Sequence, residues 1–288
     1  MKNNFFTIDD EIYPESLKNI SNPPKKIYYL GNPELLKNER FISVVGTRNN
    51  SSYGKFCCEN IVKKLVQSNV VIVSGFAIGI DTIAHKTALE KKAKTIAVVA
   101  SGLDIVYPAS NIHLWKQMEE EGLILSEFDF GVKPFRTNFP RRNRIIAGLS
   151  RATIVIESKE KGGSLVTADL ALEEGRDVYA VPADIFSENS KGCNNLIRDC
   201  RAKLLSNADE ILTDYDWLEN YDIREKEEKY DSFSDLQKNI LKVLTCEKNL
   251  DRIIEEIGCN SNEILSEIME LEILGLIKSL SGGKYIKL

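Results

Sequence analysis

Residues 139–151 read FPRRNRIIAGLSR and place four arginines within one short stretch. Guanidinium groups bind phosphate oxygens in a bidentate way, and an aromatic ring beside them can stack on a base of single-stranded nucleic acid. The candidate nucleic-acid-binding residues of this stretch are Phe139, Arg141, Arg142, Asn143 and Arg144. Arg151 stands at the far end of the same helical pattern, where we expect it only to complement the helix C-terminus.

Three glycine-containing polar loops follow short apolar runs elsewhere in the chain. They read GTRNNSSYGK (46–55), SGFAIGID (74–81) and KGGSLVTA (161–168). Exposed amides at the start of a helix bind anions, hydroxyl groups can donate to phosphate oxygens, and we expect Ser164 to cap the helix that follows. The candidate binding residues in these loops are Gly46, Thr47, Arg48, Ser74, Gly75, Lys161, Gly162, Gly163 and Ser164. Together they predict an anion-binding surface.

Motifs for several other kinds of chemistry do not occur in the sequence. The glycine loops match neither GxGxxG nor a Walker A lysine motif, so we expect no dinucleotide or other cofactor. The six cysteines lack paired CxxC spacing, which predicts no metal site and reduced thiols. No GxSxG or HExxH motif is present. Asp81 and His85 lie four residues apart; we expect Asp81 to charge a helix start and His85 to pack against a sheet.

The elements that must position these loops alternate between short apolar runs and helical patterns. Runs such as FISVVG, NVVIVSG and ATIVIE are too apolar to have a wet face, which is typical of a parallel sheet covered on both sides. We therefore predict an extended Rossmann-like, doubly wound α/β domain over residues 41–213, with residues 1–40 as a lead-in packed on its core. Its candidate loops meet at the carboxyl edge of the sheet.

The C-terminal part has a different pattern. Residues 214–232 are dense in charge and poor in aliphatic side chains, so we predict an acidic linker. Residues 233–288 show three amphipathic helices and a two-strand hairpin with Gly-Gly at its tip, the pattern of a small winged-helix domain. Its third helix carries Glu263, Glu267, Glu270 and Glu272 without Lys or Arg. Because these acids would repel phosphate, we predict a protein-contact or regulatory role; Lys278, Lys284 and Lys287 still allow weak DNA contact.

The charge of the chain is unevenly divided. The formal net charge is −5, made up of +2 in residues 1–213 and −7 in residues 214–288. The α/β part is therefore not acidic, which removes the conflict with its arginine-rich stretch. The N-terminal residues carry acids where a signal peptide would be apolar, and no apolar run reaches the roughly 20 residues that span a bilayer. We expect a cytoplasmic protein with no membrane contact.

Several motifs together resemble one known family. VVGTRNNSSYG, VSGFAIGIDTIAH, NFPRRNRIIAGLS, ESKEKGGSLVTADLALEEGRDVYAVP and GCNNLI occur in the order and spacing of the DprA/Smf family of DNA-processing proteins. The similarity runs from about Tyr13 through residue 213, and the predicted winged helix is similar to a C-terminal appendage that many members carry. The FPRRNR and GGSLVTA segments are the specific ones.

The resemblance implies a DNA-processing protein A that is not an enzyme and forms a homodimer. Such a protein binds and protects incoming single-stranded DNA in natural transformation and helps to load a RecA-type recombinase. DNA contacts are implied at Arg48, at residues 139–144, and at Lys161 with its Gly-Gly-Ser. Three departures stand out: Ile78 replaces a usual Arg, Cys200-Arg201 replaces a common Gly-Ala pair, and an N-terminal helical SAM-like domain is absent.

An enzyme is the alternative prediction. Nucleotide-binding Rossmann proteins that hydrolyse an N-glycosidic or phosphate bond use a PGGxGTxxE loop, which KGGSLVTADLALEE resembles faintly. Here Lys161 stands where proline is expected, and the spacing to the glutamate differs. Binding of single-stranded DNA is therefore the main hypothesis.

Overall fold

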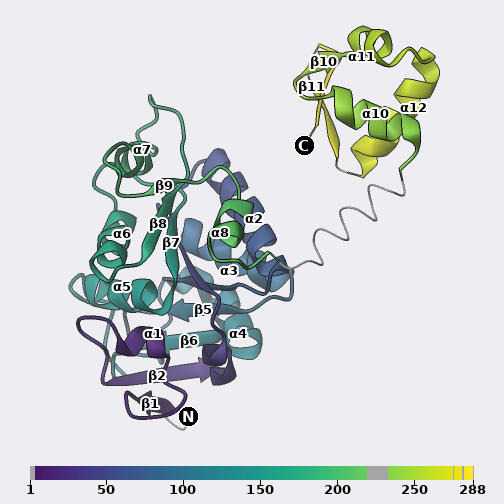
Figure 1. The fold of residues 1–288 in the computed structure, drawn as a ribbon. Helices are drawn as coiled ribbons and strands as arrows, with labels where there is room; N and C mark the ends of the chain where they lie inside the picture. Colours follow the sequence, from purple (N-terminus) through teal and green to yellow (C-terminus); the bar gives the residue numbers. More distant parts are fainter. Residues whose placement is uncertain (1–3, 219–232, 275, 281, 288) are drawn as a thin grey trace. The chain divides into compact units, whose positions relative to one another are not determined.

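The chain divides into two compact units, residues 1–218 and 219–288 (Figure 1). The computed structural model describes residues 4–218, 233–274, 276–280 and 282–287. Each unit has a hydrophobic core of its own. The first unit extends past the expected boundary at residue 213, because Tyr215 and Trp217 stack on each other and pack against its core. Most of the predicted linker, residues 219–232, lies outside the described residues.

A nine-stranded sheet forms the centre of the first unit, in the order β1-β2-β6-β5-β4-β3-β7-β8-β9. Strands β3 to β9 pair in parallel with one another, as the apolar runs predict. The chain builds outward from β3 to β6 and then returns to place β7 on the other side of β3, so the topological switch lies between β3 and β7. The strands are β1 (Phe5–Thr7), β2 (Lys26–Gly31), β3 (Phe41–Val45), β4 (Val71–Ser74), β5 (Thr95–Val98), β6 (Leu123–Ser126), β7 (Ala152–Val155), β8 (Asp177–Ala180) and β9 (Lys203–Leu204).

The N-terminal lead-in does more than pack on the core. Its strands β1 and β2 extend the sheet in antiparallel pairing beyond β6. Tyr13, Leu17 and Ile20 of the same segment are buried in the core beneath them. The short helix α1 (Glu15–Lys18) and the 3-10 helix η1 (Pro33–Lys37) complete the segment. The first forty residues are thus an integral part of the α/β unit.

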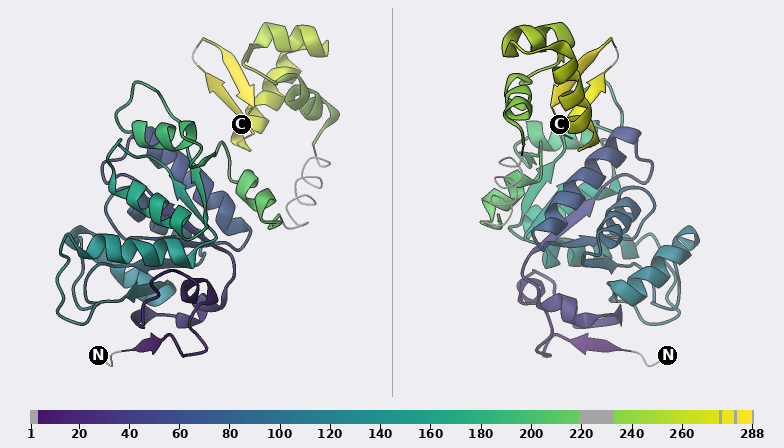
Figure 2. Two further views of the ribbon diagram at one scale, coloured as in Figure 1. Left: turned by 60° about the vertical axis from the view of Figure 1, so that its left-hand side comes forward. Right: turned by 90° about the vertical axis from the view of Figure 1, so that its right-hand side faces the viewer.

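Helices cover both faces of the sheet (Figures 1 and 2). The side chains of β3 point alternately to the two faces of the sheet. Phe41 and Val45 pack in one hydrophobic core, and Ile42 and Val44 pack in the other. The first face is covered by α1, α5 (Asn138–Leu149), α6 (Gly163–Glu173) and α7 (Lys191–Arg198). The second is covered by α2 (Ser52–Gln67), α3 (Ile80–Glu90), α4 (Ile112–Glu121) and α8 (Asp209–Asp214), with the 3-10 helix η2 (Ala109–Asn111) before α4. This is the predicted Rossmann-like layering.

One of the sequence departures falls at a strained turn. Cys200 has φ of 54°. Side chains other than glycine rarely adopt this left-handed region, so the turn carries a conformational cost. The following Arg201 pairs with Asp169 of α6. The turn at the Cys200-Arg201 pair thus carries an ion pair beside it.

The second unit contains three helices and a three-stranded antiparallel sheet of order β10-β12-β11. Asn260 caps the third helix through its side chain, and Gly282 and Gly283 both have positive φ between the last two strands. The elements are α10 (Asp235–Val243), β10 (Lys248–Asn249), α11 (Leu250–Ile257), α12 (Ser261–Ile273), β11 (Ile277–Leu280) and β12 (Lys284–Lys287). The three helices and the final hairpin agree with the sequence pattern, whereas strand β10 was not predicted.

His85 lies fully buried on α3, as its apolar neighbours predict. Its Nδ1 hydrogen-bonds with Thr95 Oγ1 over 2.7 Å, and its ring packs beside Phe76. Burial, reinforced by the positive charge of Arg142, lowers the pKa of His85 to about 3. The histidine therefore stays neutral in the folded protein throughout the physiological pH range.

This burial predicts a loss of stability in mild acid. Below the ordinary pKa of about 6.5, the unfolded chain binds a proton at residue 85 that the folded chain does not bind. Between pH 7.0 and 5.5, His85 alone should lower the free energy of unfolding by about 1 kcal/mol. Urea unfolding at the two pH values measures this.

The matched control is the exposed histidine on α4, His113. His85→Gln should reduce the difference in unfolding free energy between the two pH values, whereas His113→Gln should leave it unchanged. An equal pH dependence in wild type and His85→Gln would contradict the assignment.

Candidate nucleic-acid interface

A pocket of about 280 Å³ lies at the switch point of the sheet, between the loops that follow β3 and β7. The start of α5 and the loop after β4 complete its walls. Ten of the candidate residues predicted from the sequence line it: Gly46, Thr47, Arg48, Phe139, Arg142, Asn143, Lys161, Gly162, Gly163 and Ser164. Four segments that are far apart in the chain thus meet in one hollow.

The other four candidates do not line this pocket. Ser74 is buried and donates its hydroxyl proton to the Val44 carbonyl. A side chain at Gly75 would collide with the guanidinium group of Arg142 and the carboxylate of Asp81. These two residues therefore lie behind the residues that line the pocket and do not line it themselves. Arg141 and Arg144 lie on another side of α5.

Arg142 forms the floor of the pocket and is only 5% exposed. Its Nη1 donates hydrogen bonds to the carbonyls of Gly75, after β4, and Val98, on β5. Burial lowers the pKa of Arg142 to about 10, although the nearby Asp81 carboxylate opposes this shift. The group stays charged at neutral pH, but its main hydrogen bonds go to the protein itself.

Asp81 faces Arg142 across the floor. It stands in the first turn of α3, as expected, and its Oδ2 accepts a hydrogen bond of 3.3 Å from the Ala77 amide. Burial raises the pKa of this carboxyl, whereas Arg142 and, to a smaller degree, Arg48 lower it. Among the described residues that line the pocket, Asp81 is the single acid. Its carboxyl group and the Arg142 guanidinium both lie against Gly75, so the two groups share the floor.

The rim of the pocket is cationic. Arg48, Lys159 and Lys161 are exposed, and no described carboxylate forms an ion pair with any of them. The Arg48 guanidinium lies 5.3 Å from the centre of the Phe139 ring, and the Tyr107 ring lies 6.1 Å from that centre on its edge. Cations without ion pairs beside a half-buried aromatic ring are an arrangement that can bind phosphates and bases together.

Helix α6 begins at the pocket and presents its amide end to it. The N-cap is Gly162, without a side-chain hydrogen bond, so the expectation that Ser164 caps the helix is wrong. Ser164 instead donates to Ser158 Oγ over 2.9 Å. A Cβ on Gly162 would lie 2.1 Å from that same Oγ, which explains why glycine is needed here. Backbone amides at such a helix start favour an anion.

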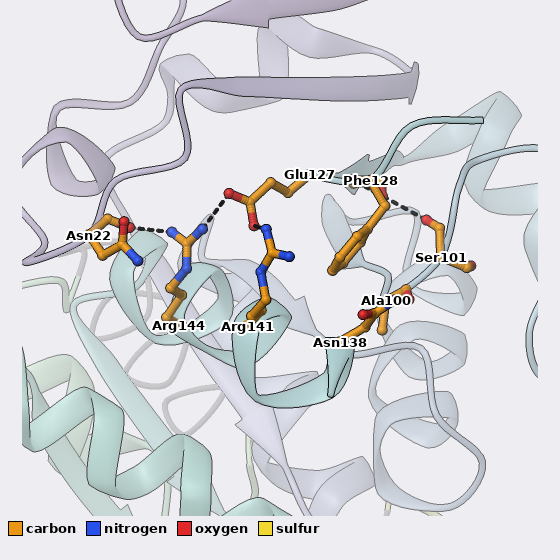
Figure 3. A network of polar contacts seen from close by, with 9 residues as sticks. Asn22, Ala100, Ser101, Glu127, Phe128, Asn138, Arg141 and Arg144 are labelled. Carbon is orange, nitrogen blue, oxygen red and sulfur yellow. Dashed lines mark hydrogen bonds and ion pairs between the residues drawn. The ribbon is translucent and has the colours of Figure 1, made fainter. Parts of the chain in front are cut away.

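Arg144 and Arg141 join α5 to the loop after β6 (Figure 3). Arg144 is buried; it pairs with Glu127 and donates to the Asn22 carbonyl of the N-terminal segment. Arg141 pairs with the same carboxylate over 3.4 Å, and its side chain is 59% exposed. Arg144 therefore links α5 to two other segments inside the protein. Arg141 remains open to solvent on the surface of α5.

Sequence reasoning missed several residues of the pocket. Ser158 and Lys159 follow the ATIVIE strand directly, ahead of the predicted loop that begins at Lys161. The signal that would have found them is their place at a strand end of the switch point. Thr167, one turn into α6, and Tyr107, in the loop after β5, have no comparable signal in the sequence. Their proximity to the site comes from the fold.

Within the described ranges, no group of three His, Cys, Asp or Glu side chains is arranged to hold a metal ion. None of the described helices is long and apolar enough to cross a membrane.

Fold and site together define a Rossmann-like α/β protein with a cation-rimmed pocket at the switch point of its sheet. The family model of DNA recombination-mediator protein A matches residues 4–216. The chain belongs to this family, and its resemblance to the DprA/Smf DNA-processing proteins is confirmed.

Relatives match over most of the chain. DNA processing protein DprA of Streptococcus pneumoniae is 43% identical over 212 residues, which is 74% of each chain. Protein Smf of Synechocystis is 35% identical and covers 98% of this chain and 79% of its own. The solved structure of the S. pneumoniae protein superposes with a TM-score of 0.70. DNA processing protein A of Helicobacter pylori, solved for its single-stranded DNA binding mode, gives 0.67 at 30% identity, over 74% of this chain and 96% of its own.

The two arginines that share Glu127 should differ in their effect on stability. Arg144→Ala removes one partner of a buried ion pair and should lower the free energy of unfolding by about 3 kcal/mol. Arg141→Ala removes an exposed partner and should cost less than about 1 kcal/mol. Urea unfolding of both variants measures the difference; equal losses would contradict the division of roles between them.

Proposed function

We propose that the chain binds single-stranded DNA along the pocket and its cationic rim. The observation that carries this proposal is the convergence of Arg48, Lys159 and Lys161, free of ion pairs, with the Phe139 ring and the amide end of α6. Membership of the DNA recombination-mediator family supports it, as does the likeness to the H. pylori protein, which binds single-stranded DNA. Cations that no carboxylate neutralises attract the backbone at little cost, because they remain hydrated until the strand binds.

Several features of the site are suited to binding a DNA strand of any base sequence. Phosphate contacts carry no base information, and a base of any type can stack on an aromatic ring, at about 1–3 kcal/mol per base. Phe139 lies beside the rim, and Phe135, just before α5, is 61% exposed. We therefore infer binding that depends on salt and on strandedness rather than on sequence.

We further propose the biological role that the family resemblance implies. The chain binds and protects incoming single-stranded DNA during natural transformation and helps to load a RecA-type recombinase. It acts in the cytoplasm as a homodimer and without a cofactor. Binding rather than hydrolysis is favoured over the enzyme alternative because Asp81 is the single acid among the described residues that line the pocket, so no pair of carboxylates is available there as general acid and base.

The rim cations should account for much of the affinity. Arg48→Ala or Lys161→Ala should weaken binding of a single-stranded oligonucleotide about tenfold, because each removes a charge-assisted contact to phosphate. Each should also reduce the slope of log K against log salt concentration by about 0.7. Fluorescence anisotropy titrations over a series of salt concentrations measure both quantities.

Lys116→Ala is the charge-matched control, since Lys116 is exposed on α4 and does not line the pocket. It should leave affinity and salt slope near those of the wild type. If all three variants bound alike with normal circular dichroism, the pocket would not be the DNA site.

We propose a protein-contact or regulatory role for the second unit. Two of the four acids on α12 are tied to α10: Ser234 donates to Glu267 and Gln237 donates to Glu270. The exposed side of this helix carries Met269 and Ile273, and described cations of the unit such as Lys284 pair with acids. A helix that lacks cations and exposes apolar side chains is better suited to a protein surface than to a DNA groove.

Truncation after Leu218 should therefore preserve DNA binding. The first unit has complete cores and contains all pocket residues, so residues 1–218 should bind a single-stranded oligonucleotide within about threefold of the full chain. Anisotropy titration of both forms, with circular dichroism as the folding control, tests this. Loss of binding by a folded truncated chain would assign DNA contact to the second unit.

A further inference from the structure

Asn143 lies on the buried side of α5 with one end of its amide held by Arg142. Arg142 Nε donates to Asn143 Oδ1 over 3.0 Å. A guanidinium group can only donate, so this bond identifies the oxygen end of the amide and leaves Nδ2 at the opposite end. Because Arg142 is itself held by the carbonyls of Gly75 and Val98, it cannot turn away from Asn143.

The other end of this amide, Nδ2, is available on the side of the pocket. Asn143 is 9% exposed and lines the hollow beside Arg142 and Asp81. No hydrogen bond joins its Nδ2 to another described residue, yet this atom is not among the completely buried unsatisfied atoms. An amide donor that is fixed in direction, reaches the pocket and has no protein acceptor is available to a ligand that enters the pocket.

We propose that Asn143 Nδ2 is a dedicated hydrogen-bond donor to an acceptor oxygen of the bound strand, and that Arg142 is a positioning residue that acts through Asn143. This inference rests on the proposed binding of single-stranded DNA in the pocket. It assigns different roles to neighbouring residues of the arginine-rich stretch, where charge alone would suggest that every arginine contacts the strand.

The electrostatics of the floor favour this division. The Arg142 guanidinium is buried and donates to the carbonyls of Gly75 and Val98, so it adds little attraction for phosphate beyond what the rim supplies. A neutral donor beside this guanidinium can bond to a strand oxygen without adding a second buried charge. The acceptor is an oxygen, provided either by the phosphodiester backbone or by a base carbonyl.

Two substitutions at residue 143 test the donor. Asn143→Ala should weaken binding of oligo(dT) about fivefold, the value of one net hydrogen bond. Asn143→Asp replaces the donor by a carboxylate oxygen next to Asp81 and should weaken binding at least tenfold. The matched control is Asn60→Asp on α2, an exposed residue outside this pocket, which adds the same charge and should change affinity less than twofold.

Oligo(dT) and oligo(dA) of equal length distinguish the two sources of the oxygen. Equal losses on both strands for Asn143→Ala assign the contact to the backbone. A larger loss on oligo(dT) assigns it to a carbonyl oxygen, because adenine has none. Unchanged affinity of both Asn143 variants for both strands would overturn the proposal.

A double-mutant cycle tests the positioning role. Arg142→Lys keeps the charge opposite Asp81 but lacks the planar guanidinium that holds Asn143 and two carbonyls at once. It should weaken binding about fivefold, the same loss as Asn143→Ala, when residue 143 is asparagine and less than twofold in the Asn143→Ala background. Equal losses in both backgrounds would show that Arg142 does not act through Asn143.

Urea unfolding curves of the four proteins of the cycle show under which conditions all of them are folded. Titrations under those conditions exclude a loss of binding that is caused by unfolding. The same titrations separate this inference from the proposed function. A wild-type chain that fails to bind either oligonucleotide refutes DNA binding itself. A wild-type chain that binds, with Arg48→Ala weakened and both Asn143 variants unchanged, refutes the role of Asn143 alone.

Discussion

The buried guanidinium group of Arg142 is the constraint on which the pocket depends. Through Arg142, the start of α5 is joined to the main chain at the ends of β4 and β5, and Asp81 adds the start of α3. A buried guanidinium without these partners would carry a large desolvation penalty, so the loops must keep the arrangement that satisfies it. The carboxyl ends of neighbouring strands are thereby fixed relative to the helix that carries Phe139 and Asn143.

The site separates what holds its shape from what attracts a ligand. Its floor is built from groups whose charges and hydrogen bonds are largely satisfied within the protein, while the cations of its rim lie in water without carboxylate partners. Such cations attract a polyanion over a long range. Because they are hydrated in the free protein, their charges cost little free energy there. Arg144 belongs to the first group despite its place in the arginine-rich stretch, because Glu127 and the Asn22 carbonyl enclose it.

The two units differ in charge as well as in fold. The α/β unit brings Arg48, Lys159 and Lys161 together at one edge of its sheet, whereas the net negative charge of the chain lies in the residues after 213. In the second unit, carboxylates on α12 bond to the start of α10, and Lys248 and Lys284 pair with nearby acids. Net charge of the whole chain is thus a poor guide to where it meets a polyanion.

The sequence by itself determined the α/β class, the parallel strands, the family and ten residues of the pocket, because apolar runs and strand-end glycines are local signals. It also placed His85 correctly inside the core. Only the tertiary structure decided that β1 and β2 extend the sheet, that Ser158 and Lys159 join the pocket, and that Arg142 and Arg144 are buried. Four adjacent residues, RRNR, contain no local signal for which side chain faces water. Their exposure depends on partners such as Asp81 and Glu127, which only long-range packing brings close.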